Sequence, residues 1–140
     1  MTLAEFIQKY VKTKVDFDKA YGCQCVDLFR QYYTDVLGIK EHTGPVEGAK
    51  DIYLNYPTMP KERKYFVRLM DSAKVKPGDI AVWGSTPTNK FGHVAIVITE
   101  INSTSLLVLE QNGFTQDGAK IVERSKTNLL GFLRAKDGNK

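Results

Sequence analysis

Residues 79–111, DIAVWGSTPTNKFGHVAIVITEINSTSLLVLEQ, contain three apolar runs separated by turn residues, and this stretch decides the fold. The runs at 79–83, 93–101 and 105–111 are rich in Val, Ile and Leu, which favour short strands. Residues 84–91 and 102–104 contain the Gly, Pro, Asn and Ser that mark turns. The pattern predicts three consecutive strands.

Further elements are expected on both sides of this stretch. Additional strands are predicted at residues 65–70, 119–124 and 131–135. Upstream, Thr2 and Glu5 have the spacing of a capping box, and apolar residues from Leu3 to Val11 recur at helical intervals. A second amphipathic helix is predicted over 24–37, and a short third helix within 48–56, stopped by Pro57. Helices first and strands afterwards predict an α+β domain with a mainly antiparallel sheet, over residues 1–136, with a polar tail at 137–140.

Composition limits the possible functions. The chain has 140 residues, 42% hydrophobic and 26% charged, as expected for one folded domain. Its net charge of +4 is dispersed without a basic block, so we expect no nucleic-acid partner. Apolar runs are too short to cross a bilayer, and residues 1–10 lack the pattern of a signal peptide. We therefore expect a monomer that does not insert into membranes and that another component releases if it acts outside the cell.

Two cysteines, Cys23 and Cys25, are separated by one residue, a spacing at which side chains diverge and a disulfide is disfavoured. Cys25 lies at the predicted start of the second helix, after a loop that contains Gly22. Unpaired amides and the helix dipole stabilise a thiolate at such a position, which suits a nucleophile. A buried apolar thiol at a helix end explains the position equally well.

The sequence around His93 favours the interpretation of Cys25 as a nucleophile over that of a buried apolar thiol. His93 opens the run FGHVAIVI, directly after a glycine that permits close backbone approach, and the next strand ends in VLEQN. Glu110 follows His93 by 17 residues, so two neighbouring antiparallel strands can place Glu110 or Asn112 beside the second imidazole nitrogen. His42 lies in a predicted surface loop. The combination predicts a cysteine nucleophile with a histidine base.

Four segments also resemble a known family: YGCQCVDLFRQY at 21–32, KPGDIAVW at 76–83, GHVAIV at 92–97 and LEQN at 109–112. In this order they are similar to the CHAP domain, the cysteine, histidine-dependent amidohydrolase/peptidase family of phage lysins and bacterial wall enzymes. The resemblance covers about residues 4–133. It implies a papain-like α+β fold and hydrolysis of amide bonds in peptidoglycan.

The resemblance also implies a role for each matching residue. Cys25 corresponds to the nucleophile, His93 to the base and Glu110 to the orienting acid. Asn112 corresponds to a further polar residue near the histidine, and Gln24 to a residue whose amide assists the oxyanion. The implied reaction passes through a thioester and uses no organic cofactor.

A metal site is predicted directly before the nucleophile. In DFDKAYGCQCVD, residues 16–27, Asp16, Asp18 and Asp27 occupy positions one, three and twelve of an EF-hand-like frame. Ala20 and Gly22 offer only backbone carbonyls. Some CHAP domains resemble this arrangement, which implies a structural Ca²⁺. The ordinary alternative is that the first two are loop carboxylates and that the third interacts with the helix dipole.

Other functions remain open at this stage. A wall peptidase of the NlpC/P60 type would use the same nucleophile and base, so the residues do not separate the two families. A catalytically silent wall-binding module is disfavoured because the Cys, His and acid positions are all filled. The amide bond that is cut, the target bacterium and the presence of a separate wall-binding domain also remain open. By resemblance, we expect a lysin held in the host cytoplasm until release and acting at the bacterial wall.

Overall fold

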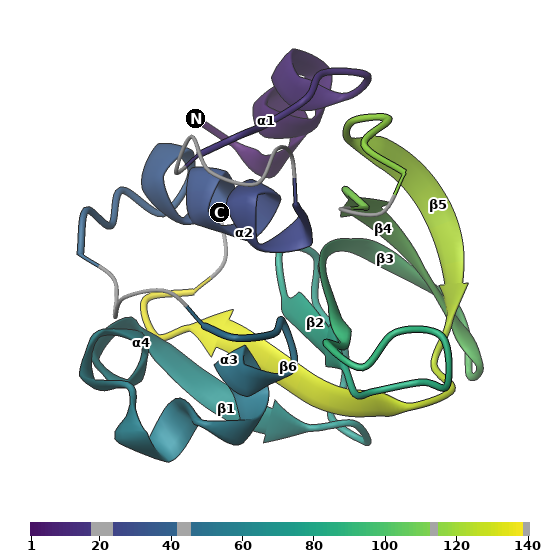
Figure 1. Ribbon diagram of the computed structural model, residues 1–140. Coiled ribbons are helices and arrows are strands. Elements are labelled where there is room, and N and C mark those ends of the chain that lie inside the picture. Colours follow the sequence, from purple (N-terminus) through teal and green to yellow (C-terminus); the bar gives the residue numbers. More distant parts are fainter. Residues whose placement is uncertain (18–23, 42–45, 113–114, 139–140) are drawn as a thin grey trace.

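The computed structural model describes residues 1–17, 24–41, 46–112 and 115–138, and its helices precede its strands (Figure 1). The helical elements are α1 (Leu3–Tyr10), α2 (Cys25–Asp35), α3 (Asp51–Leu54), the 3₁₀ helix η1 (Tyr56–Thr58) and α4 (Pro60–Tyr65). The strands are β1 (Phe66–Met70), β2 (Ile80–Trp83), β3 (His93–Asn102), β4 (Ser105–Glu110), β5 (Lys120–Ser125) and β6 (Leu129–Ala135). This order confirms the predicted α+β class and the six predicted strands.

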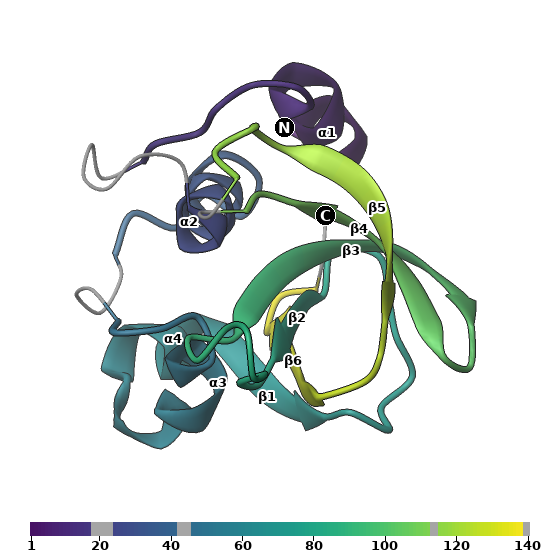
Figure 2. The same ribbon diagram turned by 45° about the vertical axis from the view of Figure 1, so that its right-hand side comes forward.

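The strands form one antiparallel sheet in the order β1-β6-β2-β3-β4-β5. Strands β2 to β5 follow one another as neighbours because their connections are short, whereas β6 returns to lie between β1 and β2. The sheet is strongly curved (Figure 2). The curvature lets one face pack against the helices while the other face packs its own side chains together.

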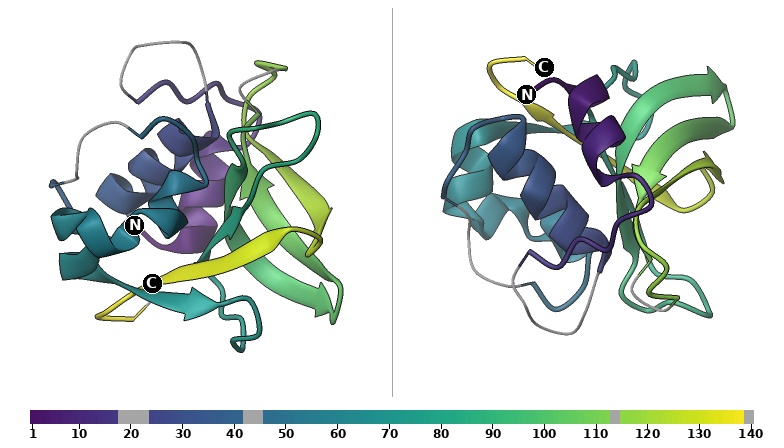
Figure 3. Two further views of the ribbon diagram at one scale, coloured as in Figure 1. Left: turned by 60° about the horizontal axis from the view of Figure 1, so that its bottom comes forward. Right: turned by 90° about the horizontal axis from the view of Figure 1, so that it is seen from above.

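Residues alternate between these two faces along each strand. On the helix side, Val94 and Ile96 of β3 join a core cluster with Phe29 of α2. On the opposite face, Ala95 and Val97 join a second cluster. The second cluster also contains Ala81, Trp83, Leu106, Val108, Leu129 and Phe132. The helices gather on one side of the sheet (Figure 3). The curved sheet therefore has two cores, which fix β3 from both faces.

Helix α1 begins as its sequence predicts. The Thr2 amide donates to Glu5 Oε1 at 3.0 Å, and the Glu5 amide donates to Thr2 Oγ1 at 3.1 Å, which completes the capping box. Phe6 is fully buried and meets the ring of Tyr32 edge-on, with centroids 5.4 Å apart. After the helix, the Lys12 amide donates to the Ala119 carbonyl at 2.7 Å. The N-terminal helix is thus attached both to α2 and to the chain that enters β5.

The segment between α2 and the sheet differs from the sequence-based prediction. Helix α2 ends at Asp35, two residues earlier than expected, and α3 is only four residues long. Helix α4 was not predicted, and it covers Tyr65, which was assigned to the following strand. Pro60 begins α4, a position that tolerates proline because that amide has no helical partner. Glu62 of α4 is fully buried and accepts a hydrogen bond from Arg30 Nη1 at 2.8 Å, which joins α4 to α2.

Candidate active site

Cys25 is the first residue of α2, as the sequence predicts. Gln24 precedes it as the N-cap in an extended conformation (φ −109°, ψ 163°). The backbone N–H of Gln24 donates to Asp27 Oδ2 at 3.0 Å. Cys25 is a free, half-buried thiol. The amides and the dipole at the start of this 11-residue helix favour negative charge, and the half-buried side chain of Cys25 is still accessible to a ligand.

His93 is the first residue of β3 and pairs with Trp83 of β2, with ring centroids 5.9 Å apart. Gly92 has φ +76°, and a Cβ at that position would lie 2.4 Å from the Trp83 carbonyl oxygen. Only glycine permits this turn so close to the neighbouring strand. The predicted role of the glycine before the histidine is therefore confirmed: it lets the chain enter β3 against β2, with His93 9% exposed.

Glu110 lies on the same face of the sheet as His93, with 3.1 Å between His93 Nε2 and Glu110 Oε1. The register explains the contact, because Ile96 pairs with Leu109 and Glu110 ends β4 beside the start of β3. His93 is also hydrogen-bonded to Cys25. Since Nε2 faces Glu110, Nδ1 is the nitrogen left for the thiol. The structure thus brings the three predicted residues together in the order Cys25, His93, Glu110.

The charges of His93 and Glu110 stabilise each other. Burial acts to lower the pKa of His93, but the hydrogen bonds that its ring makes to Cys25 and Glu110, together with the negative charge of these two groups, raise it to about 9. Burial acts to raise the pKa of Glu110, but hydrogen bonds and positive charge from His93 and Arg124 lower it to about 2. At neutral pH the imidazole is therefore protonated and the carboxyl is ionised.

Arg124 of β5 is a site residue that the sequence analysis missed. Its Nε donates to Glu110 Oε1 at 2.6 Å, and its Nη2 donates to Glu110 Oε2 at 2.7 Å. Its guanidinium carbon lies 5.7 Å from the centre of the Trp83 ring. Trp83 is 4% exposed and belongs to the second core cluster. In the sequence, the alternation of KIVERS places Arg124 on the same side as Val122, which was an available but weak signal.

Gln111 is a second missed residue. It is fully buried, and its Nε2 donates to the carbonyls of Val15 at 2.7 Å and Gln24 at 2.8 Å. Its Oε1 accepts from the Val15 amide at 2.8 Å. These bonds hold both ends of the segment before Cys25 against the end of β4. The motif LEQN contains this residue, but its amide has no distinctive spacing that would reveal the partners.

The remaining predicted residues are placed as follows. Asn112 is half-buried after β4, and its carbonyl accepts from the Gln116 amide at 3.1 Å, so its catalytic role stays a prediction. Asp16 is half-buried, and its Oδ1 has no hydrogen-bond partner among the described residues. Asp27 is buried in the first turn of α2. The predictions for Asp18, Ala20, Gly22, Cys23 and His42 lie outside the described residues.

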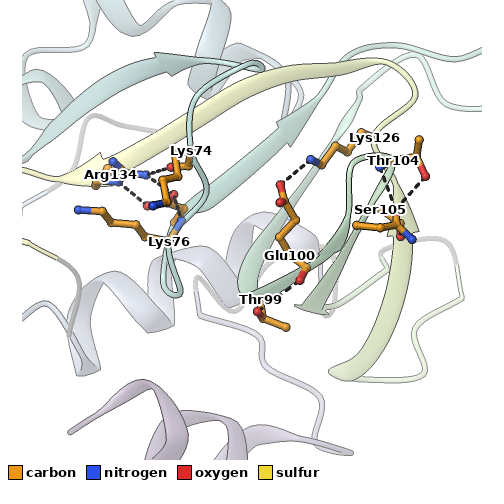
Figure 4. Close-up of polar contacts among 10 residues, drawn as sticks. Lys74, Lys76, Thr99, Glu100, Thr104, Ser105, Lys126 and Arg134 are labelled. Carbon is orange, nitrogen blue, oxygen red and sulfur yellow. Dashed lines mark hydrogen bonds and ion pairs between the residues drawn. The ribbon is translucent and has the colours of Figure 1, made fainter.

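A shallow groove of about 520 Å³ lies elsewhere on the molecule. Its walls are Asp71, Ser72, Ala73, Lys74, Glu100, Ser103, Lys126 and Leu129. Lys126 Nζ contacts Glu100 Oε2 at 2.7 Å there (Figure 4). The groove is mixed in charge and contains none of the predicted catalytic side chains, so we do not assign the active site to it. In the part of the chain that the structure describes, no helix is long and apolar enough to span a membrane.

The fold and the Cys–His–Glu arrangement are those that the sequence resemblance implies for a thiol-dependent hydrolase. A family model described as the CHAP domain matches residues 14–112, which include Cys25, His93 and Glu110. The chain therefore belongs to the CHAP-domain family.

Individual relatives agree with this assignment. Endolysin PlyTW of Staphylococcus phage Twort is 30% identical over 146 residues, covering 92% of this chain and 28% of that protein. The crystal structure of the endolysin LysIME-EF1 matches with a TM-score of 0.66 and 18% identity, covering 96% of this chain and 64% of that one. The structure of Ly7917 with the hydrolyzing product of MDP matches with a TM-score of 0.65 and 20% identity, covering 91% and 59%. The structural matches confirm the fold, and this chain spans less than two thirds of each of these relatives.

Proposed function

We propose that this chain is a peptidoglycan hydrolase that cleaves an amide bond with Cys25 as nucleophile, His93 as general base and acid, and Glu110 as the orienting carboxylate. The observation that carries the proposal is the continuous contact from the thiol at the start of α2, through His93, to Glu110 Oε1 at 3.1 Å from Nε2. Family membership and the likeness to proteins named as endolysins support peptidoglycan as the substrate.

The reaction begins from a thiolate–imidazolium pair. Because the pKa of His93 is about 9, the imidazole holds a proton at neutral pH. The thiolate attacks the scissile carbonyl carbon and forms a C–S bond, and the carbonyl π electrons move onto oxygen. The α2 amide groups near Cys25 and the Gln24 side chain are the proposed donors to this oxyanion.

Collapse of the tetrahedral intermediate breaks the C–N bond, and His93 gives its proton to the leaving amine. The acyl group remains on Cys25 as a thioester. His93, now neutral, takes a proton from water, whose oxygen attacks the thioester carbonyl. The C–S bond then breaks, the carboxylic acid product leaves, and His93 again holds the proton beside the thiolate. Glu110 keeps the imidazole oriented through both half-reactions.

Two alternatives share parts of this geometry. An NlpC/P60-type peptidase would use the same nucleophile and base on a wall peptide. A silent wall-binding module would keep the fold without turnover. The hydrogen bond between Cys25 and His93 favours a hydrolase over the silent module, because a binding protein does not require a base beside its thiol.

Digestion of purified Gram-positive cell walls followed by mass spectrometry of the released fragments tests the proposal. Wild type and Cys23→Ala should release fragments with new amino ends, whereas Cys25→Ala should release none. The fragment masses identify the bond, either N-acetylmuramoyl-L-alanine or a peptide cross-bridge. Release by Cys25→Ala would refute the thiol mechanism, and no release by wild type from several wall types would favour the binding module.

We also propose that Asp16, Asp18 and Asp27, with the carbonyls of Ala20 and Gly22, hold a structural Ca²⁺. The described residues fit in part: Asp16 Oδ1 is buried without a hydrogen-bond partner among them, which suits an oxygen that coordinates a cation. The ion would supply positive charge that fixes the segment before Cys25. The proposed setting is the bacterial wall, which the protein reaches from the host cytoplasm after release.

A further inference from the structure

The Glu110 carboxylate has two partners, and Arg124 binds it more extensively than His93 does. Oε1 accepts hydrogen bonds from Arg124 Nε at 2.6 Å and from His93 Nε2 at 3.1 Å. Oε2 accepts a hydrogen bond from Arg124 Nη2 at 2.7 Å. Glu110 is 2% exposed, so water does not compete freely for these oxygens. A bidentate pair fixes the plane of a carboxylate as well as its position. The orientation of Oε1 opposite His93 is therefore set from the Arg124 side.

Arg124 is itself held in place by the tryptophan that packs against His93. Its guanidinium carbon is 5.7 Å from the centre of the Trp83 ring, and that ring centre is 5.9 Å from the centre of the His93 ring. Trp83 Nε1 donates to the Ser125 carbonyl at 2.9 Å, next to Arg124 in β5. His93, Glu110, Arg124 and Trp83 thus form a closed ring of side chains contributed by four adjacent strands.

We propose that Arg124, supported by Trp83, is a positioning residue for the Cys25–His93 pair, which it serves by fixing both oxygens of Glu110. This inference rests on the proposed function, because it assigns Arg124 a role in the same thiol mechanism. Arg124 acts through Glu110 and does not contact the reacting atoms.

The charge of Arg124 also decides whether Glu110 is ionised. Burial acts to raise the pKa of Glu110, and the bonds and charges of His93 and Arg124 together hold it at about 2. Removing Arg124 leaves burial opposed by His93 alone, so the pKa of Glu110 must rise. A protonated Glu110 is a poorer acceptor for the imidazolium, so orientation of His93 is lost at a higher pH than in the wild type.

The chain provides a matched control on another part of the sheet. Arg134 Nε donates to Asp79 Oδ1 at 2.8 Å and its Nη2 donates to Oδ2 at 2.7 Å, with Asp79 fully buried. Figure 4 shows Arg134 with its hydrogen bonds. This pair has the same bidentate form as Arg124–Glu110. Arg134→Gln therefore removes an equivalent ion pair while His93 keeps its carboxylate.

The test compares wild type, Arg124→Gln, Arg124→Lys and Arg134→Gln by NMR titration of the Glu110 carboxyl and by wall hydrolysis. In Arg124→Gln the Glu110 pKa should rise from about 2 by about 1–3 units, and kcat should fall about 10- to 100-fold with KM little changed. The acid limb of its pH–rate profile should move to higher pH. Arg124→Lys, which keeps the charge without the planar fork, should restore most of the pKa and only part of kcat. Arg134→Gln should lower the unfolding temperature about as much as Arg124→Gln does, but it should change neither the Glu110 pKa nor kcat.

Two results would overturn the proposal. The first is a Glu110 pKa near the wild-type value in Arg124→Gln. The second is an equal fall in kcat in Arg134→Gln, which would show that kcat reflects only stability. If Arg124→Gln fails to fold, Arg124→Lys provides the test. A Glu110 pKa close to that of the wild type together with a reduced kcat would support the proposal. The carboxyl titration needs no substrate, so absence of wall hydrolysis in the wild type would refute the proposed function while Arg124 is still tested.

Discussion

Replacing Glu110 by Gln tests the electrostatic origin of the raised pKa of His93. The substitution keeps the size of the side chain but removes the negative charge 3.1 Å from His93 Nε2. It also leaves the positive charge of Arg124 without its carboxylate. Both changes act against protonation of the imidazole, and burial, which already opposes it, is unchanged. The pKa of His93 must therefore fall.

The size of the fall follows from the wild-type pKa. The value of about 9 stands above an ordinary value of 6.5, a difference equivalent to about 3 kcal/mol. Glu110 supplies one of the two hydrogen bonds and one of the two negative charges that raise it. Loss of this contribution is expected to lower the pKa by about 2 units, to roughly 7. At pH 8 the protonated fraction of His93 then falls from roughly 90% to roughly 10%.

NMR titration of the imidazole measures this pKa directly, because the chain has two histidines and His42→Gln assigns the signals. The alkaline limb of wall hydrolysis should move with it, from near pH 9 to near pH 7, since His93 must hold a proton to release the amine. Asp79→Asn, which removes a buried carboxylate from the Arg134 pair, should leave both unchanged. A His93 pKa that stays near 9 in Glu110→Gln would refute the assignment of Glu110 as a cause of the raised pKa.

Three further predictions concern stability. The raised pKa of His93 contributes stability that is complete below about pH 6.5 and is lost as the pH rises towards about 9. The lowered pKa of Glu110 contributes stability that is complete above about pH 4.5 and is lost as the pH falls towards about 2. Urea unfolding of wild type and His93→Gln should therefore differ most between pH 4.5 and 6.5, by about 3 kcal/mol, and a pH-independent difference would contradict this. Gln111→Leu should lower the free energy of unfolding by about 2–4 kcal/mol, because it leaves the buried amide and carbonyl of Val15 and the partly buried carbonyl of Gln24 unpaired. As a control in the same assay, Gln31→Ala loses a partly buried hydrogen bond to Asp35 and should cost about 1 kcal/mol or less. EGTA should lower the thermal unfolding midpoint of the wild type by roughly 5–10 °C if the free calcium concentration beforehand is about 100 times the Kd. In Asp16→Asn, EGTA should leave the midpoint unchanged. Equal shifts of the midpoint in both proteins would exclude Asp16 as a ligand.

The sequence predicted the parts of this molecule that depend on local patterns. The six strands follow from short apolar runs between turn residues, and α1 follows from the spacing of Thr2 and Glu5. The His93–Glu110 contact was also predictable, because 17 residues with one short turn leave few ways to pair two strands. The position of Cys25 at the start of α2 was also predictable, and that position made its thiol the candidate nucleophile.

Helix α4 was missed because its sequence, PKERKY, has no apolar stripe. Its buried residue is Glu62, which is stable there because Arg30 lies opposite, 32 residues earlier in the chain. No local pattern contains that information. A buried ion pair of this kind is apparent only when both partners are placed in space.

Arg124 was missed for a different reason. In the β4–β5 ladder Glu110 pairs with Lys120, so register alone would predict that lysine as the counter-ion. Lys120 instead contacts Asp117 at 3.0 Å, and Arg124, whose cross-strand partner is Leu106, reaches Glu110 along the same face. The length of the arginine side chain, the curvature of the sheet and the packing of Trp83 decide the pairing. These are tertiary properties.

The end of β4 positions both halves of the proposed catalytic pair. Glu110 points to the face that carries His93. Gln111, the next residue, continues onto the helix face and binds the backbone of Val15 and of Gln24, the residue immediately before Cys25. Because side chains alternate along a strand, two consecutive residues can hold the base from one face and the start of the nucleophile helix from the other. A slip of β4 by one residue would exchange these two side chains and lose both sets of contacts. The register of β3 and β4, fixed by two apolar cores, is therefore the property of the fold on which the distance between thiol and imidazole depends.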